Sequence, residues 1–395
     1  MNDKNVLLKS LGDVELYLLS LLVFFLPFEK LVTLKEVIFI LLTTIFIVNK
    51  FLLKRDLRVI FSKNRLLHIL IIVSIVWALV ALVTAIKPYY SFHEIITKMT
   101  KQYLVYFIAF CIAYSQTDQK KLRIIFYSLI LSAGIMSIYG CFQFYVNPAF
   151  FDNRISGFTG AFYRLATLLV ISIPAAIILL FKTENRLKFV LFLFLLLMLI
   201  ATFLTCTRSA WLGIIVEATI LIFIFFKRYR KIFVIFVVLM VSTVILLSNE
   251  SILPKKILIR GSEKPRLEAF KLSINILKEY PITGIGYGKK TFSFKYPDVS
   301  EVKHSHNIIV NTAIETGLIG SFLMLFILFI IIRDLFMGIN SSKNNMFLII
   351  IFTSATGYLV LNLFDYMYHG WPGQLFWILI GMCYGVLKRY EEISI

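Results

Sequence analysis

Two histidines stand two positions apart at the start of a long apolar segment, in the stretch KHSHNIIVNTAIETGLIG at residues 303–320. Histidine titrates near neutral pH, so His306 is a candidate general base that takes the proton of a hydroxyl group, with His304 as the alternative base. A metal pair is the competing hypothesis, but on a helix side chains two residues apart point about 200° apart and do not converge. Asn307 either orients a substrate or caps the helix that follows.

Arginines stand in the short polar connections between apolar blocks. Arg208 lies in CTRSAWLG, Arg266 in PRLEAF, and Arg154 and Arg164 in FDNRISGFTGAFYR. The planar guanidinium group binds phosphate oxygens in pairs and stays charged at any working pH, so an arginine here can stabilise a phosphate-bearing group. The alternative for Arg208 is a cation that reaches out to lipid headgroups.

Acidic residues are sparse in the same connections. Asp365 and His369 share the stretch NLFDYMYHGWPG, where we expect Asp365 to orient an arginine or a histidine. Glu315 and Asp365 are the two acids that could serve as a nucleophile in a covalent mechanism. There is no Asp-x-Asp run to hold a divalent cation, and the cysteines lack metal or disulfide spacing, so we expect no metal site. The four cysteines are Cys111, Cys141, Cys206 and Cys383.

The elements that position these residues are expected to be membrane helices. Hydrophobic residues make up 59% of the chain and charged residues only 16%. A spanning helix needs roughly 20 apolar residues, and blocks of this length predict an all-α polytopic membrane protein with about 12 transmembrane helices. The blocks are centred in residues 14–28, 36–53, 66–86, 102–115, 124–142, 164–181, 189–205, 210–226, 232–248, 308–332, 346–364 and 372–387.

Positive charge predicts how these helices are oriented. The net charge of +19 is concentrated in alternate short connections, which places those connections on the cytoplasmic side. Both termini are therefore expected in the cytoplasm, and nucleic-acid binding is not expected. The first block lacks a small-residue cleavage site and is expected to be an anchor, not a signal peptide. The basic connections are NKFLLKRDLRVIFSKNR, TDQKKLR, KTENRLK and KRYRK, with Lys388 and Arg389 after the last block.

One connection is much longer than the others and carries mixed charge. It divides the chain into residues 1–248 with helices one to nine, an outward loop at 249–307, and residues 308–395 with helices ten to twelve. Long loops are usually functional. An amphipathic helix is predicted between Pro265 and Pro281, and the following PITGIGYG predicts a tight turn that approaches a ligand or another helix. The apolar positions of this helix are Leu267, Phe270, Leu272, Ile274 and Leu277.

These motifs, in this order, resemble the O-antigen ligase and polymerase family of membrane enzymes that move lipid-linked glycans. CTRSAWLG is similar to the family's arginine turn at the eighth span, and PRLEAF to its loop helix with a second arginine. HNIIVNTAIETGLIG is similar to its most specific signature, His-Asn, nine residues and Gly-x-x-Gly, here His306, Asn307, Gly317 and Gly320. The resemblance implies a GT-C-like membrane glycosyltransferase of the bacterial inner membrane, with its long loop and active site facing the periplasm.

The resemblance also implies a reaction. The donor would be a glycan on undecaprenyl diphosphate, and the acceptor a sugar hydroxyl of the lipid A-core oligosaccharide. Transfer would be a single displacement with inversion, without a metal ion or other cofactor. In this scheme His306 is the general base, and Arg208 and Arg266 stabilise the departing diphosphate. The residues expected to bind substrate are Arg154, Tyr287, His304, Asn307 and Asp365.

Three functions stay open at this point. A ligase passes the glycan to lipid A-core, whereas a polymerase of the same family extends the lipid-linked glycan, so the two differ in the acceptor. A transporter of lipid-linked oligosaccharide is the third, because twelve spans are also common among carriers. We see no inverted repeat of broken spans, and the candidate polar residues gather at one face instead of the midplane, which favours an enzyme.

Overall fold

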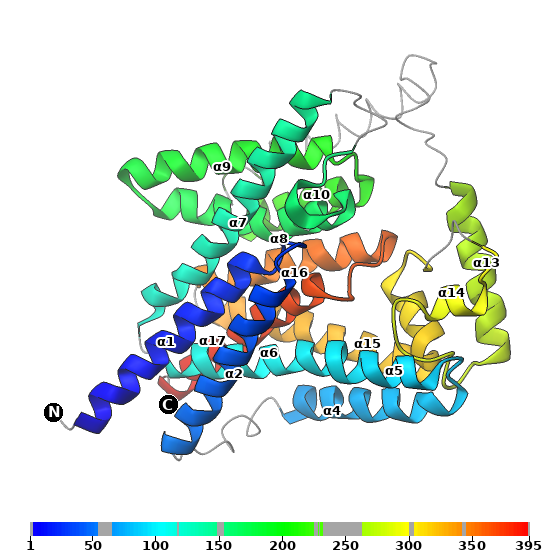
Figure 1. Cartoon of the computed structure of the whole chain (residues 1–395). Helices are drawn as coiled ribbons and strands as arrows, with labels where there is room; N and C mark the ends of the chain where they lie inside the picture. Colours follow the sequence, from blue (N-terminus) through cyan, green and yellow to red (C-terminus); the bar gives the residue numbers. More distant parts are fainter. Residues whose placement is uncertain are drawn as a thin grey trace.

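The computed structural model describes residues 3–53, 65–116, 118–147, 154–224, 228, 230–231, 263–299, 304–341 and 345–393, and this part of the chain is helical and contains no strand (Figure 1). Its long helices are α1 (Asp3–Phe25), α2 (Val32–Leu53), α4 (Arg65–Val80), α6 (Thr100–Ser115), α7 (Gln119–Val146), α8 (Phe162–Lys182), α9 (Asn185–Leu204), α10 (Arg208–Ile224), α13 (Glu263–Glu279), α15 (Ile308–Ser341), α16 (Met346–Phe364) and α17 (Trp371–Ile393). The short ones are η1 (Ala81–Thr84), α5 (Pro88–Glu94), η2 (Ile95–Met99), η3 (Gly157–Thr159) and α14 (Thr291–Lys295).

The helices have the lengths and compositions of membrane spans. Eight helices of the described part are long and apolar enough to cross a membrane. Each predicted apolar block in that part overlaps a helix, and the ninth block, 232–248, lies outside the described residues. The polytopic all-helical class is therefore supported, while the count of twelve spans stays a prediction.

Helices α6 and α17 run in the same direction. Gln102 near the start of α6 donates a 2.9 Å hydrogen bond to the carbonyl oxygen of Tyr368, which lies just before α17. Farther along, Gly385 of α17 backs onto the carbonyl oxygen of Phe110. The loop 365–370, which joins α16 to α17, therefore lies at the end of the bundle where α6 begins.

Helices α1 and α7 run parallel to each other and opposite to α6. Lys121 pairs with Asp13 at 2.6 Å, and Ser132 donates to the carbonyl oxygen of Phe24 at 2.8 Å. The short link after α6 turns the chain back into α7. Both chain ends thus lie at one end of the bundle, as Figure 1 shows. We call the opposite end the loop end; it gathers the connections 26–31, 81–99, 154–161, 281–299, 304–307 and 365–370.

Helix α15 is broken at Gly317, which has φ 74°. Ser321 Oγ donates a 3.0 Å hydrogen bond to the carbonyl oxygen of Ile309, although twelve residues of straight helix would separate them by about 18 Å. The segment before Gly317 therefore folds back against the segment after it. The predicted block at 308–332 gave no sign of this break, because hydrophobic periodicity does not register a single backbone dihedral.

The loop 281–286 replaces the hydrogen bonds that this break removes from the helix. Leu318 N donates to the carbonyl oxygen of Pro281 at 2.8 Å, and Ile285 N donates to that of Ile314 at 2.8 Å. Gly286 N bonds the carbonyl of Glu315 at 3.1 Å. The predicted close approach of PITGIGYG to another helix is confirmed, and it leaves these buried backbone groups paired.

Gly317→Ala should destabilise the protein by about 2 kcal/mol or more. A left-handed φ disfavours alanine, and the added Cβ would overlap the carbonyl oxygen of Ile282. The thermal unfolding midpoint in detergent measures the effect. Gly12→Ala in α1 is the matched control, because nothing lies within 4 Å of its Cβ position. Equal midpoints for the two variants would show that the break is not strained.

The predicted loop helix is confirmed as α13, but its apolar positions divide between two faces. Ala269 and Ile276 are fully buried and belong to a small core with Ile285, Phe292 and Ile314. By contrast, the side chains of Leu267, Phe270 and Ile274 are 57%, 48% and 40% exposed. Ala269 and Ile276 therefore make the contact with the bundle. The sequence pattern had pointed to larger apolar residues, three of which are exposed.

Candidate functional site

His304, His306 and Asp365 converge at the loop end. Nδ1 of His306 lies 3.3 Å from Oδ1 of Asp365, and the ring centroids of the two histidines are 4.2 Å apart. The backbone explains the convergence, since residues 304–307 form a bend in which His306 has φ 56°. The argument that the two rings diverge applies to a helix, and residues 304–307 are not helical.

Asn307 caps the helix that follows it. Its side-chain oxygen accepts hydrogen bonds from the backbone N–H groups of Ile309 and Val310, at 2.9 and 3.0 Å. Its side-chain nitrogen donates to the carbonyl oxygen of Leu363 at 2.9 Å. Of the two roles considered for Asn307, the structure shows the cap, and the same side chain ties the start of α15 to the end of α16.

The environment of Asp365 keeps its carboxyl group ionised. Burial raises its pKa, but the hydrogen bond with His306, attraction to His304 and His306 in their charged forms, and the Tyr366 N–H outweigh burial and hold the pKa below its usual value. A carboxylate only accepts hydrogen bonds, so Nδ1 of His306 donates in this pair, and in the neutral imidazole Nε2 carries the lone pair. Asp365 thus orients a histidine, one of the two roles expected for it.

His304 stays neutral over the working pH range. Burial, followed by the charge of His306, lowers its pKa to about 3. Its Nδ1 can therefore accept the hydrogen bond of the His306 backbone N–H, at 3.3 Å. The side chain of His304 supports the bend that presents His306.

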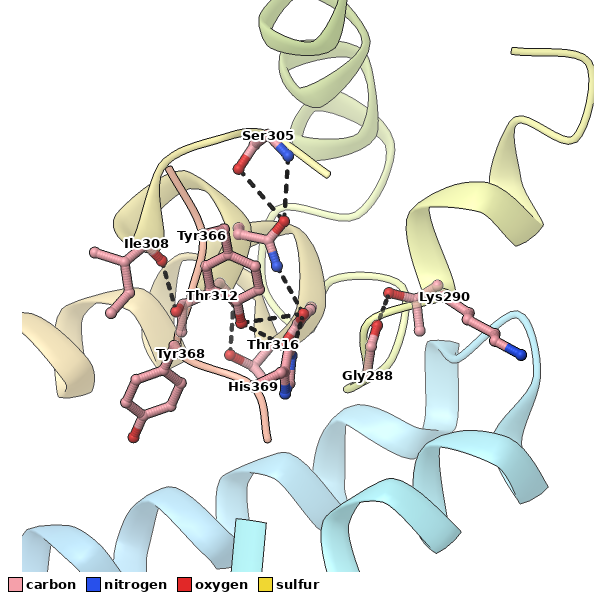
Figure 2. Close-up of polar contacts among 12 residues, drawn as sticks. Gly288, Lys290, Ser305, Ile308, Thr312, Thr316, Tyr366, Tyr368 and His369 are labelled. Atoms are coloured by element: carbon pink, nitrogen blue, oxygen red, sulfur yellow. Dashed lines mark hydrogen bonds and ion pairs between the residues drawn. The ribbon is translucent and has the colours of Figure 1, made fainter. Parts of the chain in front are cut away.

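Glu315 connects the two sides of this site. Its Oε1 accepts from Asn311 Nδ2 at 2.6 Å and from Tyr366 Oη at 3.3 Å, and lies 2.8 Å from Nε2 of His369. Asn311 Oδ1 in turn accepts from the backbone N–H of Ser305 at 3.3 Å. Figure 2 shows Ser305 at one edge of this network and Tyr366 and His369 at the other.

Glu315 is 2% exposed and enclosed by these partners, so it is placed to hold the site together, not to attack a substrate. Sequence reasoning considered it only as a nucleophile and missed Asn311 and Tyr366. The sequence did contain a signal for the role of Glu315. It is an acidic residue within an apolar helix, and such a residue requires hydrogen-bond partners. Asn311 offered a second signal, since it stands four residues earlier on the same helical face.

Tyr287 is buried next to this network and does not lie on an exposed surface. It is 5% exposed, and its ring stands edge to face with His369, with centroids 4.9 Å apart. Its hydroxyl has no hydrogen-bond partner in the described part of the chain. The ring borders a cavity of about 40 Å³ that Glu315, Tyr366 and Tyr368 also line, which is room for water but not for a sugar.

The arginines stand apart from the histidines. Arg208 is exposed at the first position of α10. This helix begins at the loop end and crosses α16, where Gly213 packs against the carbonyl oxygen of Gly357. Arg266 is half-buried in α13, which packs on α15. Arg154 lies over the ring of Phe162 at 4.4 Å. None of the three hydrogen-bonds to His306 in the described residues.

Residues 193–326 match the family model described as O-antigen ligase. This segment of the chain is similar to the O-antigen ligase family. It runs from α9 through α10 and α13 into α15, and it contains Arg208, Arg266 and His306. The resemblance drawn from the three motifs is thereby confirmed. No curated protein sequence matches the chain.

The segment that matches the O-antigen ligase family supplies one side of the site. Asp365, Tyr366 and His369 stand beyond it, in the loop after α16. The folded chain brings that loop to the start of α15, where Asp365 meets His306 and His369 meets Glu315.

Proposed function

We propose that this protein is a glycosyltransferase that moves a glycan from undecaprenyl diphosphate to a sugar hydroxyl of lipid A-core at the periplasmic face. The observation that carries the proposal is the pair of His306 and Asp365 at the loop end. In the neutral imidazole this pair puts the proton on Nδ1 and leaves Nε2 to act as a base, and 27% of the His306 side chain is exposed. The match of residues 193–326 to the O-antigen ligase family supports glycan transfer as the reaction class.

The proposed reaction is a single displacement. Nε2 of His306 takes the proton of the acceptor hydroxyl, whose oxygen attacks the anomeric carbon of the donor sugar. The bond from that carbon to the diphosphate breaks on the opposite face, and its electron pair leaves with the diphosphate oxygen. Asp365 stabilises the imidazolium that forms, as an oriented carboxylate does for a histidine base.

Arg208 and Arg266 are the proposed partners of the departing diphosphate. Arg208 is exposed at the first position of α10, where the helix dipole adds positive potential for an anion. Nε of Arg266 is buried without a hydrogen-bond partner in the described residues, so its guanidinium retains donors for an oxyanion.

The deciding experiment offers purified protein a lipid-linked glycan with lipid A-core as the acceptor. Glycan on lipid A supports the ligase. Longer lipid-linked glycan instead identifies a polymerase of the same family. Movement of the lipid-linked glycan across vesicles with no glycosidic bond made or broken would identify a transporter and reject the enzyme.

Chelation tests whether the converging side chains of the site hold a metal ion. The ligand atoms of His304, His306 and Asp365 lie within 4.8 Å of one another, a spacing that a cation could bridge. All three groups already have hydrogen-bond roles, because His306 bonds Asp365 and His304 accepts from the His306 backbone. We expect the rate of transfer to be unchanged in a strong chelator. Loss of transfer that added metal restores would contradict the metal-free scheme.

A further inference from the structure

Two adjoining hollows lie at the loop end, beside the connection between α1 and α2. Their volumes are about 450 Å³ and about 340 Å³, and both are lined by Tyr139 and Gln143 near the end of α7. Each volume is in the range of ligand pockets. Together they form an elongated site on the same end of the bundle as His306, and no step of the proposed reaction uses them.

Aromatic rings form one wall of these hollows. Phe158 stacks on Tyr139 with centroids 3.9 Å apart and planes 13° apart, and on its other side it faces Phe28 at 6.0 Å and 16°. Phe142 continues the row 6.4 Å from Tyr139. The rim is polar and carries both signs of charge, with Glu29 and Lys30 on the first hollow and Arg154 on the second.

The polar rim is held in place before any ligand binds. Gln143 Oε1 accepts hydrogen bonds from the backbone N–H groups of Ser156 and Gly157, at 3.2 and 3.0 Å. This leaves the side-chain nitrogen of Gln143 without a partner in the described residues, so it can donate to a ligand. Glu29 is fixed by a 2.8 Å ion pair with Arg164 and by its own N–H, which donates to the Phe158 carbonyl at 3.0 Å.

We propose that these hollows form a saccharide-binding subsite, which holds sugar units distant from the bond being made. A sugar ring has an apolar C–H face that suits an aromatic wall and hydroxyl edges that suit an amide, a carboxylate and a cation. A diphosphate would not be drawn to a rim that includes Glu29. A lipid chain would leave the rigid donor of Gln143 unpaired. The subsite rests on the proposed function in one respect, which is that the bound saccharide is identified as the glycan of the transfer reaction.

The test uses variants that alter this wall in the full chain. Phe158→Leu keeps an apolar side chain and removes the ring, while Gln143→Glu keeps the two accepted bonds and removes the donor. Tyr145→Ala is the control, because Tyr145 is 82% exposed at the same end of α7 and lines neither hollow. An aromatic contact contributes about 1 kcal/mol, so we expect KM for a long glycan to rise about five-fold with kcat unchanged.

Substrate length identifies which glycan occupies the subsite. A higher KM for long donors, with one-repeat donors unaffected, assigns it to the donor glycan. A higher KM for the acceptor alone assigns it to lipid A-core. Equal effects on short and long substrates, no effect of either variant, or the same effect from Tyr145→Ala would overturn the subsite.

A binding measurement keeps the subsite testable apart from catalysis. Saturation-transfer NMR detects the free oligosaccharide, released from the donor, on the His306→Ala protein, which retains the hollows. The signal should persist in Tyr145→Ala, and in Phe158→Leu about five-fold more oligosaccharide should be needed to reach it. Binding without transfer by the wild type would reject the proposed function and keep the subsite. A phospholipid retained in native mass spectrometry, with no oligosaccharide signal, would overturn it.

Discussion

Glycan transfer should fall by about 10²–10⁴-fold in His306→Ala, the range typical for loss of a general base. The acceptor hydroxyl then keeps its proton, and no neighbouring group replaces the lost Nε2. His304 lies beside His306, but burial lowers its pKa to about 3, which makes it a weak base, and its Nδ1 already accepts the His306 backbone N–H. Transfer is measured with purified protein, lipid-linked glycan and acceptor, and binding of the donor should remain.

Two companion variants separate the base from its supports. Asp365→Asn should lower kcat strongly, because an amide does not fix Nδ1 as the protonated nitrogen. In His304→Ala, by contrast, the imidazole and its carboxylate partner remain, so the loss should be smaller than in His306→Ala. Wild-type transfer by His306→Ala would remove this residue as the base, and a greater loss in His304→Ala would move the role to His304.

Arg208→Ala and Arg266→Ala should each reduce transfer by about 10²–10³-fold, the range seen when one stabiliser of developing charge is removed. Lysine at either position should restore little, because a point charge does not reproduce the two parallel bonds of a guanidinium group to phosphate. The effect should appear in kcat, since charge on the leaving diphosphate grows during the reaction.

Arg186→Ala is the matched control for these arginine variants. Arg186 is also exposed, but it lies near the start of α9, at the end of the bundle opposite the site. Its loss should leave transfer unchanged. Full rescue by lysine at both Arg208 and Arg266 would indicate simple charge attraction instead of paired bonds.

The helices were the predictable part of this structure. Segments that face lipid must pair their backbone N–H and C=O groups among themselves, so a long apolar block is expected to form a helix. The amphipathic helix α13 was also predictable, because Pro265 and Pro281 bound a periodic segment. Which of its faces packs was not, since burial of Ala269 and Ile276 depends on the loop and helix that meet them.

The site was predictable in its residues but not in its geometry. His306 and Asp365 stand 59 positions apart, and no local pattern pairs them. The left-handed backbone of His306 depends on Ser305, Asn311 and Asn307, which hold the bend from both sides. Hydrophobic periodicity does not register these short-range side-chain bonds, so a helix was the default expectation and gave the wrong direction for the two rings.

The bonds between residues 281–286 and α15 make two distant segments one cooperative unit. Opening the loop exposes the carbonyl groups of Ile314 and Glu315, and the segment that carries His306 loses its support with them. We expect the amides of both segments to exchange with solvent together. A substitution in 281–286 that abolishes activity is therefore weak support for a substrate contact there, because it removes the base by local unfolding.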